Sequence, residues 1–295
     1  INTTDDYQGL FGYAEESAIG NLGVIKSFIK GGTYVGGIVG YSGSMISDCY
    51  NTGTVKGNST VGGVAGKGIS YITNCFNTGV VTGTGDQVGG LTGYGTAENC
   101  YNTGAVSGIS CVGGITGYLY SDIVINCYNT GTVGGDSNIG GVAGYVDRGV
   151  VINCYYLTGS AAGGIKGINA VGQAEALTSE QMKQKSNFVG WDFEYEWFTD
   201  AQYRYDNSSE YPQLQIFGDF SSVPSSAVWS GLTDTVWAGS GSEADPFLIT
   251  SAEELAGAAE RVFYSPKYFK LTTDIILNRF DFLYWQHGAK QWTPI

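Results

Sequence analysis

The sequence predicts an all-β protein whose main body, residues 1–175, is a right-handed parallel β-helix of about six coils. Three observations predict this fold. The block "CYNTG", with looser copies, recurs at intervals of 25 to 27 residues, starting at Cys49, Cys75, Cys100, Cys127 and Cys154. A second block, "VGGIVGY" from Val35, recurs with the same period. Each unit contains about three short apolar runs separated by glycine-containing turns, without helical periodicity.

Stacking explains why such a unit repeats. About 26 residues cannot bury their own apolar face, whereas stacked copies bury a continuous core. Strand-only units of this length favour one unit per coil, with a rise of about 4.8 Å per coil. Equivalent positions then form columns along the axis, so each position favours a residue type that packs on itself.

Four columns follow from this arrangement. The five cysteines are small and apolar enough to form an inward column. The next position stacks aromatic rings: Tyr50, Phe76, Tyr101, Tyr128 and Tyr155. The position after it stacks amides that can hydrogen-bond along the column: Asn51, Asn77, Asn102 and Asn129. Glycines fit corners that need a positive φ or a close backbone approach: Gly53, Gly79, Gly104 and Gly131.

These units resemble the GLUG-motif repeats of bacterial and archaeal surface proteins. The likeness is carried by the "GG-[ILV]-[AVT]-G-[YK]" and "NCYNTG" blocks and covers roughly residues 8–160. The resemblance implies an extracellular or cell-wall β-helix, often part of a large adhesin-like protein. Some family members carry a protease domain beside the repeats. No motif of such a protease occurs in this chain, so the resemblance implies no activity.

Residues 176–217 are expected to close the array. The stretch "ALTSEQMKQKSNFVGWDFEYEWF" from Ala176 resembles the short helix and Trp-rich segment that follow such repeats in this family. Thr178 and Gln181 have the spacing of a capping box at the start of that helix. The stretch "YPQLQIF" from Tyr211 resembles the final strand of the cap.

Residues 218–228 are expected to form a linker, and residues 229–295 a strand-helix-strand segment. Ser251 and Glu254 have the spacing of a second capping box. The segment resembles the one that opens a β-helix domain in this family, yet here it follows the repeats. The chain could be cut from a longer tandem protein, or be a polymer subunit whose C-terminal segment completes the next copy. Alternatively, the segment folds back onto its own first coil. All three interpretations cover an otherwise unpaired strand edge.

The charge balance limits the classes of partner. The chain has 14 basic and 27 acidic residues, and its net charge of −13 disfavours nucleic acid and anionic membranes. No apolar run is long enough to insert into a membrane. A low proportion of charged residues, 14%, together with abundant Gly, Thr, Asn and Tyr, is typical of extracellular or cell-surface chains. Possible partners are other copies joined end to end, or glycans and proteins of a host or cell wall.

The cysteines could carry chemistry of their own. Neighbouring residues of the inward column are close enough for disulfides, although side chains on in-register parallel strands point the same way and strain the bridge. No CxxC spacing supports a zinc site. Buried free thiols are the favoured interpretation. Cys111 differs, because it occupies a polar, outward column and is the candidate exposed thiol; its column-mates are Tyr34, Thr60, Gln87 and Asn138.

We expect no catalytic residue, metal ligand or cofactor. His287 is the only histidine and has no nucleophile motif nearby. The acids of the coils stand at different repeat positions, so no facing pair is forced: Asp48, Asp86, Glu98, Asp122, Asp136 and Asp147. Ca²⁺ in the acidic turns is an open alternative, although no recognised calcium loop occurs.

The predicted function is a non-enzymatic structural or adhesion module of a large cell-surface protein. One alternative is a self-assembling filament or envelope subunit, joined end to end through its terminal segments. Another is a polysaccharide-binding or polysaccharide-active β-helix. A flat surface of ladders favours the first two functions, whereas an outward groove with clustered acids favours an enzyme.

Overall fold

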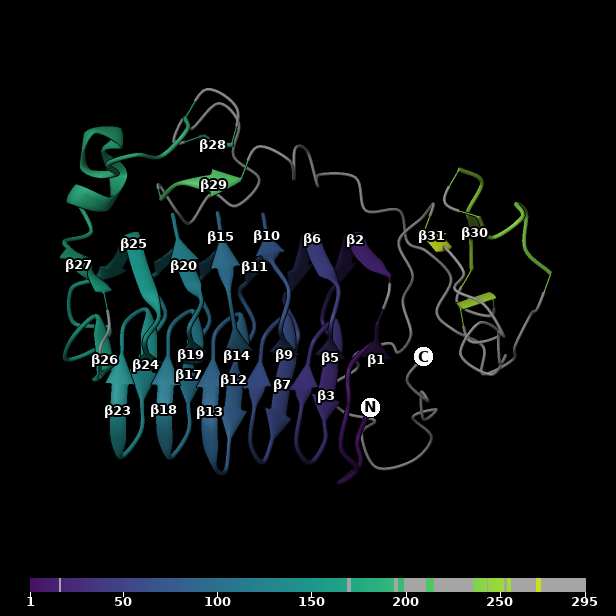
Figure 1. Cartoon of the computed structure of the whole chain (residues 1–295), viewed down its shortest axis with the longest axis horizontal. Coiled ribbons are helices and arrows are strands. Elements are labelled where there is room, and N and C mark those ends of the chain that lie inside the picture. Colours follow the sequence, from purple (N-terminus) through teal and green to yellow (C-terminus); the bar gives the residue numbers. More distant parts are fainter. Residues whose placement is uncertain are drawn as a thin grey trace.

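The repeats fold as a parallel β-helix, which confirms the predicted fold class (Figure 1). The computed structural model describes residues 1–15, 17–168, 171–193, 196–198, 211–214, 236–242, 244–251, 254–255 and 269–271. Four sheets run along the solenoid, so a complete coil contributes to four faces rather than to the three runs expected. All pairings between coils are parallel within the described part of the solenoid.

Two sheets of five strands form adjoining faces. Sheet A consists of β3 (Phe28–Lys30), β7 (Thr54–Gly57), β12 (Val81–Gly83), β17 (Val106–Ser107) and β22 (Val133–Gly134). Sheet B consists of β4 (Val35–Gly36), β8 (Val61–Gly62), β13 (Asp86–Gly89), β18 (Ser110–Gly113) and β23 (Ser137–Gly140).

The other two faces are longer. Sheet C consists of β1 (Phe11–Ala14), β5 (Val39–Ser42), β9 (Ala65–Gly68), β14 (Thr92–Gly95), β19 (Thr116–Tyr120), β24 (Ala143–Asp147) and β26 (Ile165–Ile168). Sheet D consists of β2 (Ala18–Val24), β6 (Met45–Asn51), β10 (Ile72–Thr73), β11 (Phe76–Asn77), β15 (Ala97–Glu98), β16 (Tyr101–Asn102), β20 (Ile123–Ile125), β21 (Tyr128–Asn129), β25 (Val150–Leu157) and β27 (Val171–Leu177).

The solenoid is longer than predicted. Seven strands in sheet C mean at least seven coils rather than about six. The additional coil contains β26 and β27, where both sequence blocks have been lost. Backbone pairing continues there because a parallel ladder needs hydrogen-bonding groups and not the side chains of the motif.

Apolar side chains fill the interior as two clusters that extend along the solenoid. One cluster lies between sheets C and D and includes the cysteine column with Ile46, Ile72 and Val124. The other lies between sheets A and B and consists mainly of valines, such as Val55, Val81 and Val106. β-Branched residues suit both clusters because they pack well on a pleated surface.

The two sequence blocks fit each other inside the coil. A Cβ on Gly63, the second glycine of its "GG" pair, would lie 2.3 Å from the Asn77 Cγ and from the backbone oxygen of Gly90. A Cβ on the first glycine, Gly62, would lie 2.1 Å from the Ala65 backbone oxygen. The first glycine therefore permits a tight turn, and the second gives room to the asparagine of the other block.

The corners with positive φ are not at the glycines. The structure confirms the close approach at Gly79, where a Cβ would lie 1.8 Å from the Gly53 backbone oxygen, but it gives these corner glycines no positive φ. Left-handed residues form two other columns, with φ from 49° to 55° in the first and from 51° to 62° in the second. One column precedes the cysteines: Asn21, Asp48, Asn74, Asn99, Asn126 and Asn153. The other opens the glycine block: Tyr7, Tyr34, Thr60, Gln87, Cys111 and Asn138.

Thr60 is a poor residue for this conformation, because a β-branched side chain is strained at φ 55°. Replacing Thr60 with Asn, the residue at the equivalent position 138, is expected to raise the free energy of unfolding by about 1 kcal/mol. Urea denaturation measures this change. The reverse replacement, Asn138→Thr, serves as the control and should lower stability by a similar amount. Equal stability of both variants and the wild type would contradict the strain.

The closing segment forms two 3₁₀ turns, η1 (Gln181–Lys183) and η2 (Lys185–Asn187), rather than the single short helix that was predicted. The predicted capping box is confirmed. The Thr178 backbone N–H donates to the Gln181 Oε1 at 2.8 Å, and the Gln181 backbone N–H donates to the Thr178 Oγ1 at 3.2 Å. The strands β28 (Trp197–Phe198) and β29 (Gln213–Leu214) then pair antiparallel, and β29 lies in the stretch predicted as the final strand.

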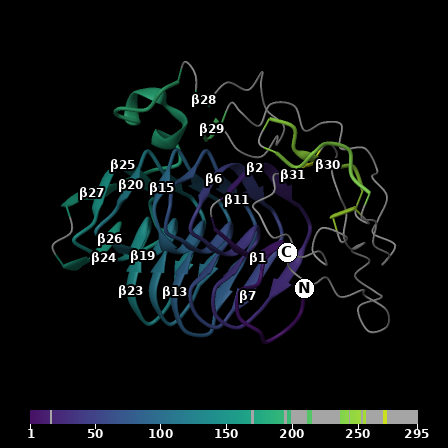
Figure 2. The same cartoon turned by 45° about the vertical axis from the view of Figure 1, so that its right-hand side comes forward.

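The C-terminal segment contains β30 (Phe247–Ile249) and β31 (Phe269–Leu271), which pair in parallel. Figures 1 and 2 place both strands beside β1 and β2, at the first coil. The Glu254 backbone N–H donates to the Ser251 Oγ at 3.1 Å, whereas the Glu254 carboxylate accepts from the Thr250 backbone N–H and hydroxyl. Half of the second capping box is therefore present. The predicted linker 218–228 lies outside the described residues.

Candidate functional surfaces

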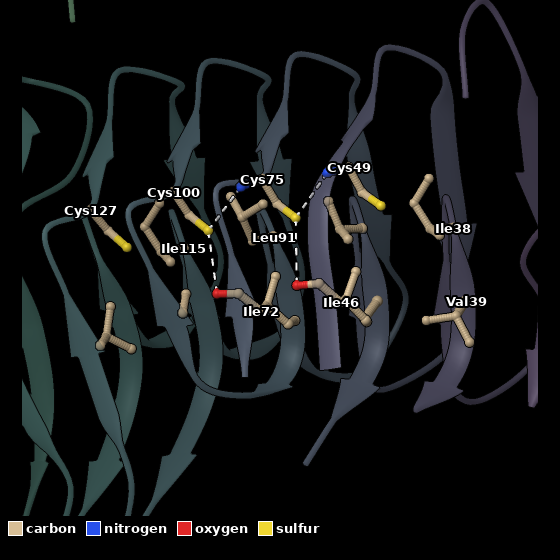
Figure 3. Packing of buried hydrophobic residues seen from close by; sticks show 14 of the residues in the cluster. Ile38, Val39, Ile46, Cys49, Ile72, Cys75, Leu91, Cys100, Ile115 and Cys127 are labelled. Atoms are coloured by element: carbon tan, nitrogen blue, oxygen red, sulfur yellow. Dashed lines mark hydrogen bonds between the residues drawn. The ribbon is translucent and has the colours of Figure 1, made fainter. Parts of the chain in front are cut away.

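The cysteine column is buried, and its members lie one above another in the core (Figure 3). The Cys49 backbone N–H lies 3.3 Å from the Cys75 Sγ, and the Cys75 backbone N–H lies 3.4 Å from the Cys100 Sγ. All six cysteines of the chain are free thiols in the structure. Burial raises the pKa of the Cys75 and Cys127 thiols well above the usual value, which keeps them protonated and unreactive.

Cys111 is more accessible than the column but is half-buried rather than fully exposed. Its Sγ lies 3.6 Å from the Ser110 Oγ, and the Asn138 Nδ2 lies 4.0 Å from it. Burial also raises the pKa of this thiol.

A thiol-specific reagent at pH 8 is expected to modify one cysteine, Cys111, in the native chain and six in denaturant. The reason is that the five column cysteines are almost completely buried. The rate at Cys111 should increase with pH, because its raised pKa leaves little thiolate near neutrality. In the Cys111→Ser control, the native chain should not react. Several reactive thiols in the native chain, or fewer than six after unfolding, would contradict this assignment.

The predicted asparagine column forms a continuous hydrogen-bonded ladder. The side-chain Nδ2 of each residue donates to the Oδ1 of the next at 2.8 Å, from Asn51 through Asn77 and Asn102 to Asn129. Each amide also closes a local turn; for example, the Asn77 Nδ2 donates to the Gly79 oxygen and its Oδ1 accepts from the Gly79 N–H. All four residues are fully buried. The ladder is therefore a structural element and offers no group to a ligand.

The predicted aromatic column is buried from Phe76 to Tyr155, and Tyr50 is half-buried. Tyr50, Phe76, Tyr101 and Tyr128 stack with ring centroids 4.9–5.1 Å apart and interplanar angles of 3–8°. Tyr155 leaves this stack and meets Phe188 edge to face. The closing segment covers the column with Trp191 and Trp197, whose ring centroids lie about 6 Å from that of Tyr128. These rings hold the cap on the solenoid.

A second aromatic ladder lies on the outer face of sheet C, where Tyr13 is exposed and the other members are half-buried. The column prediction did not include it. We call it the tyrosine stripe: Tyr13, Tyr41, Lys67, Tyr94, Tyr118 and Tyr145. Its members stand in register on successive coils. They are the last letter of each glycine block, written "[YK]" in the motif, so the signal was present in the sequence.

Ring stacking preorganises the tyrosine stripe. Tyr13 and Tyr41 stack at 4.7 Å with an interplanar angle of 3°, and Tyr118 stacks on Tyr94 at 5.4 Å and on Tyr145 at 5.6 Å. The Lys67 Nζ lies 5.6 Å from the Tyr41 ring centre and 4.8 Å from that of Tyr94, within cation–π range. Because the rings cover one another's faces, they present edges and hydroxyls to solvent.

The acids of the coils are not arranged as a metal site in the described part of the chain. Within the described part of the chain, no group of three or more His, Cys, Asp or Glu side chains is arranged to hold a metal ion. Burial raises the pKa of Glu196, and the nearby negative charges of Asp192, Asp48 and Glu98 add to the shift. His287 lies outside the described residues.

Comparison with known proteins supports the motif and the fold. The family model of the GLUG motif matches residues 31–56, so the chain carries at least one GLUG motif, as the resemblance predicted. No curated protein matches the sequence significantly. A crystal structure of a "putative immunoglobulin A1 protease" from Bacteroides ovatus is similar, with a TM-score of 0.52 and 22% identity over 72% of this chain and 73% of that chain. At this identity the likeness shows the fold alone.

No helix in the described ranges combines the length and the apolar character that crossing a membrane requires. The β-helix presents its four sheets to the outside along its length, with the closing segment lying on sheet D (Figure 1). The tyrosine stripe on sheet C joins regular spacing with access to solvent.

Proposed function

We propose that this chain is a non-enzymatic structural and adhesion module of a large extracellular, cell-surface protein. The observation that carries the proposal is the tyrosine stripe, a preorganised row of solvent-facing side chains on a rigid scaffold. Stacking has already restricted the side-chain rotamers, so a ligand that contacts the row loses little further conformational entropy. The GLUG motif and the low proportion of charged residues support the extracellular location.

The chemistry of the stripe favours a neutral, hydroxyl-rich polymer as the ligand. Phenol hydroxyls both donate and accept hydrogen bonds, and they recur at the coil spacing of about 4.8 Å. A β-linked polysaccharide laid along the axis presents hydroxyls at a comparable interval. The net charge of −13 disfavours polyanionic chains.

Binding of the chain to immobilised neutral cell-wall glycans tests this function. The double variant Tyr94→Ser/Tyr118→Ser is expected to bind at least about tenfold more weakly, which corresponds to about 1.4 kcal/mol. The matched control is Ile109→Ser, which removes a side chain that is 46% exposed but lies outside the stripe. Unchanged binding by the double variant, or equal loss in the control, would contradict the proposal.

A polysaccharide-active β-helix is the alternative that one observation favours. Glu196 lies near the carboxylates of Asp192, Asp48 and Glu98, and burial raises its pKa, which is the direction that a general acid requires. If this alternative holds, the wild-type chain releases reducing ends from a polysaccharide and Glu196→Gln does not. A wild-type chain without hydrolytic activity on the glycans it binds leaves the adhesion module as the function.

A further inference from the structure

The end of the solenoid at the first coil is covered by the chain's own C-terminal segment. Leu10, Ile19 and Leu22 belong to this coil and are 4–7% exposed, although the described solenoid stacks on only one side of them. Ile249 and Leu255 belong to the same buried cluster, and Trp237 packs against it. Figures 1 and 2 show β30 and β31 beside this coil. Of the three sequence interpretations, the structure realises the fold-back.

The end cap, as we call residues 236–242, 244–251, 254–255 and 269–271, has its own small core. The rings of Trp237 and Phe247 lie 5.4 Å apart, and the Phe269 ring lies 5.9 Å from Trp237 and 5.5 Å from Phe247. The Trp237 Nε1 donates to the Glu254 backbone oxygen at 3.0 Å. These contacts lie within the end cap, so they do not depend on which first coil it covers.

The opposite end of the solenoid is less well covered. Tyr156 and Ile165 of the last coil pair with Asn129 and Ala143 of the preceding coil. The two residues are nine positions apart in the last coil and fourteen apart in the preceding one, so the last coil is shorter. The shortened coil adds no strand to sheet B, so β23 is its last strand. Ile139, Ile165 and Ala174 are only partly buried there. An open strand edge with apolar neighbours tends to associate unless it is covered.

The attachment point of the end cap lies nearer to this opposite end. The Tyr128 Oη donates to the Pro212 oxygen at 2.7 Å, so β29 is held over the fifth of the seven rungs of sheet D. The first rung is four steps away, about 19 Å, and the last is two steps away, about 10 Å. Residues 215–235 connect β29 to the end cap, and 21 residues reach at most about 70 Å.

We propose that the end cap is exchangeable: it docks on the first coil of a second copy and thereby joins copies head to tail. In the closed form the end cap docks on its own first coil, and in the exchanged form it docks on that of another copy. The contacts are the same in both forms, so their free energies differ mainly by the entropy of association. A short tether gives an effective concentration of about millimolar. Exchange therefore becomes important where copies are crowded, and this inference stands apart from ligand binding by the tyrosine stripe.

Two complementary full-length variants test the exchange. In Ile249→Asp the end cap cannot dock but the first coil is intact, and in Leu10→Asp the first coil cannot receive but the end cap is intact. Each variant alone should be monomeric by size exclusion with light scattering, whereas their mixture should form a 1:1 complex. Far-UV circular dichroism checks that both are folded. Leu22→Asp replaces Leu10→Asp if the latter unfolds.

The control mixes Ile249→Asp with the double variant Leu10→Asp/Ile249→Asp, which has no functional end cap. Separate monomers in the complementary mixture would overturn the proposal, as would equal association in the control, because strand edges would then join the copies. In an independent measurement, the wild-type mass should increase with concentration towards the millimolar range, and Ile249→Asp should abolish the increase. A wild-type monomer throughout that range would also overturn the exchange.

Discussion

Replacing Gly90 with alanine is expected to lower the free energy of unfolding by about 3 kcal/mol or more. A Cβ at this position would lie 2.0 Å from the Gly114 backbone oxygen and 2.5 Å from the Asn102 Cγ. Backbone cannot rotate away as a flexible side chain can, so two coils must separate or the turn must distort. The cost therefore falls at the upper end of the overpacking range. Urea denaturation followed by circular dichroism measures it.

Gly134→Ala is the matched control, because no atom lies within 4 Å of a Cβ built on Gly134. This glycine is exposed and lies in β22 of the same array. The control should be neutral or more stable by up to about 1 kcal/mol, since alanine restricts the unfolded chain. Similar destabilisation by both substitutions would show that the close approach of the next coil is not the reason why glycine is required at the second position of the "GG" pair.

The second large effect is expected for Asn77→Leu, at about 3–5 kcal/mol. The Asn77 amide makes four hydrogen bonds inside the core: to both neighbouring asparagines and to the N–H and oxygen of Gly79. Leucine fills a similar volume but leaves buried donors and acceptors without these partners, each at a cost of about 1–3 kcal/mol. Thermal and urea unfolding with a folded-state check by circular dichroism measures the loss.

Asn129→Leu provides the graded control for this prediction. Asn129 is bonded to one neighbouring asparagine, because the next rung places Tyr156 beside it. It should therefore lose one hydrogen bond fewer than Asn77, and the destabilisation should be smaller. A larger effect at position 129 than at position 77 would contradict the view that the ladder stabilises through its rung-to-rung bonds.

The repeated positions were predictable because each coil provides the same environment. The inward cysteines, the Asn51–Asn129 ladder and the stack from Tyr50 to Tyr128 all follow from register alone. The left-handed corner before each cysteine could also have been predicted, since Asn and Asp tolerate that conformation and occur there in every copy. For the corner glycines the sequence predicts a positive φ or a close backbone approach, and the structure shows the close approach alone.

The unrepeated parts were not predictable in the same way. The seventh coil has lost the motif and is held by backbone pairing, so periodicity does not reveal it. The position of the end cap depends on which apolar surface Ile249 and Leu255 meet, and three docking modes use the same residues. The tyrosine stripe was visible as a letter of the motif. Its exposure could not be inferred, because the turn between sheets B and C decides which way that letter points.

The central claim is that hydrogen bonds between equivalent asparagines hold successive coils in register. Hydrogen exchange of the asparagine side-chain amides, measured by nuclear magnetic resonance, tests this claim most directly. The Nδ2 protons of Asn51, Asn77 and Asn102 bond to the next coil and are buried, so opening them requires separation of coils. Their exchange should be at least about a thousandfold slower than that of the exposed Asn58, as expected for opening free energies above about 4 kcal/mol. If the Asn77 amide exchanged as fast as that of Asn58, the continuous ladder, and with it the stacking register, would be wrong.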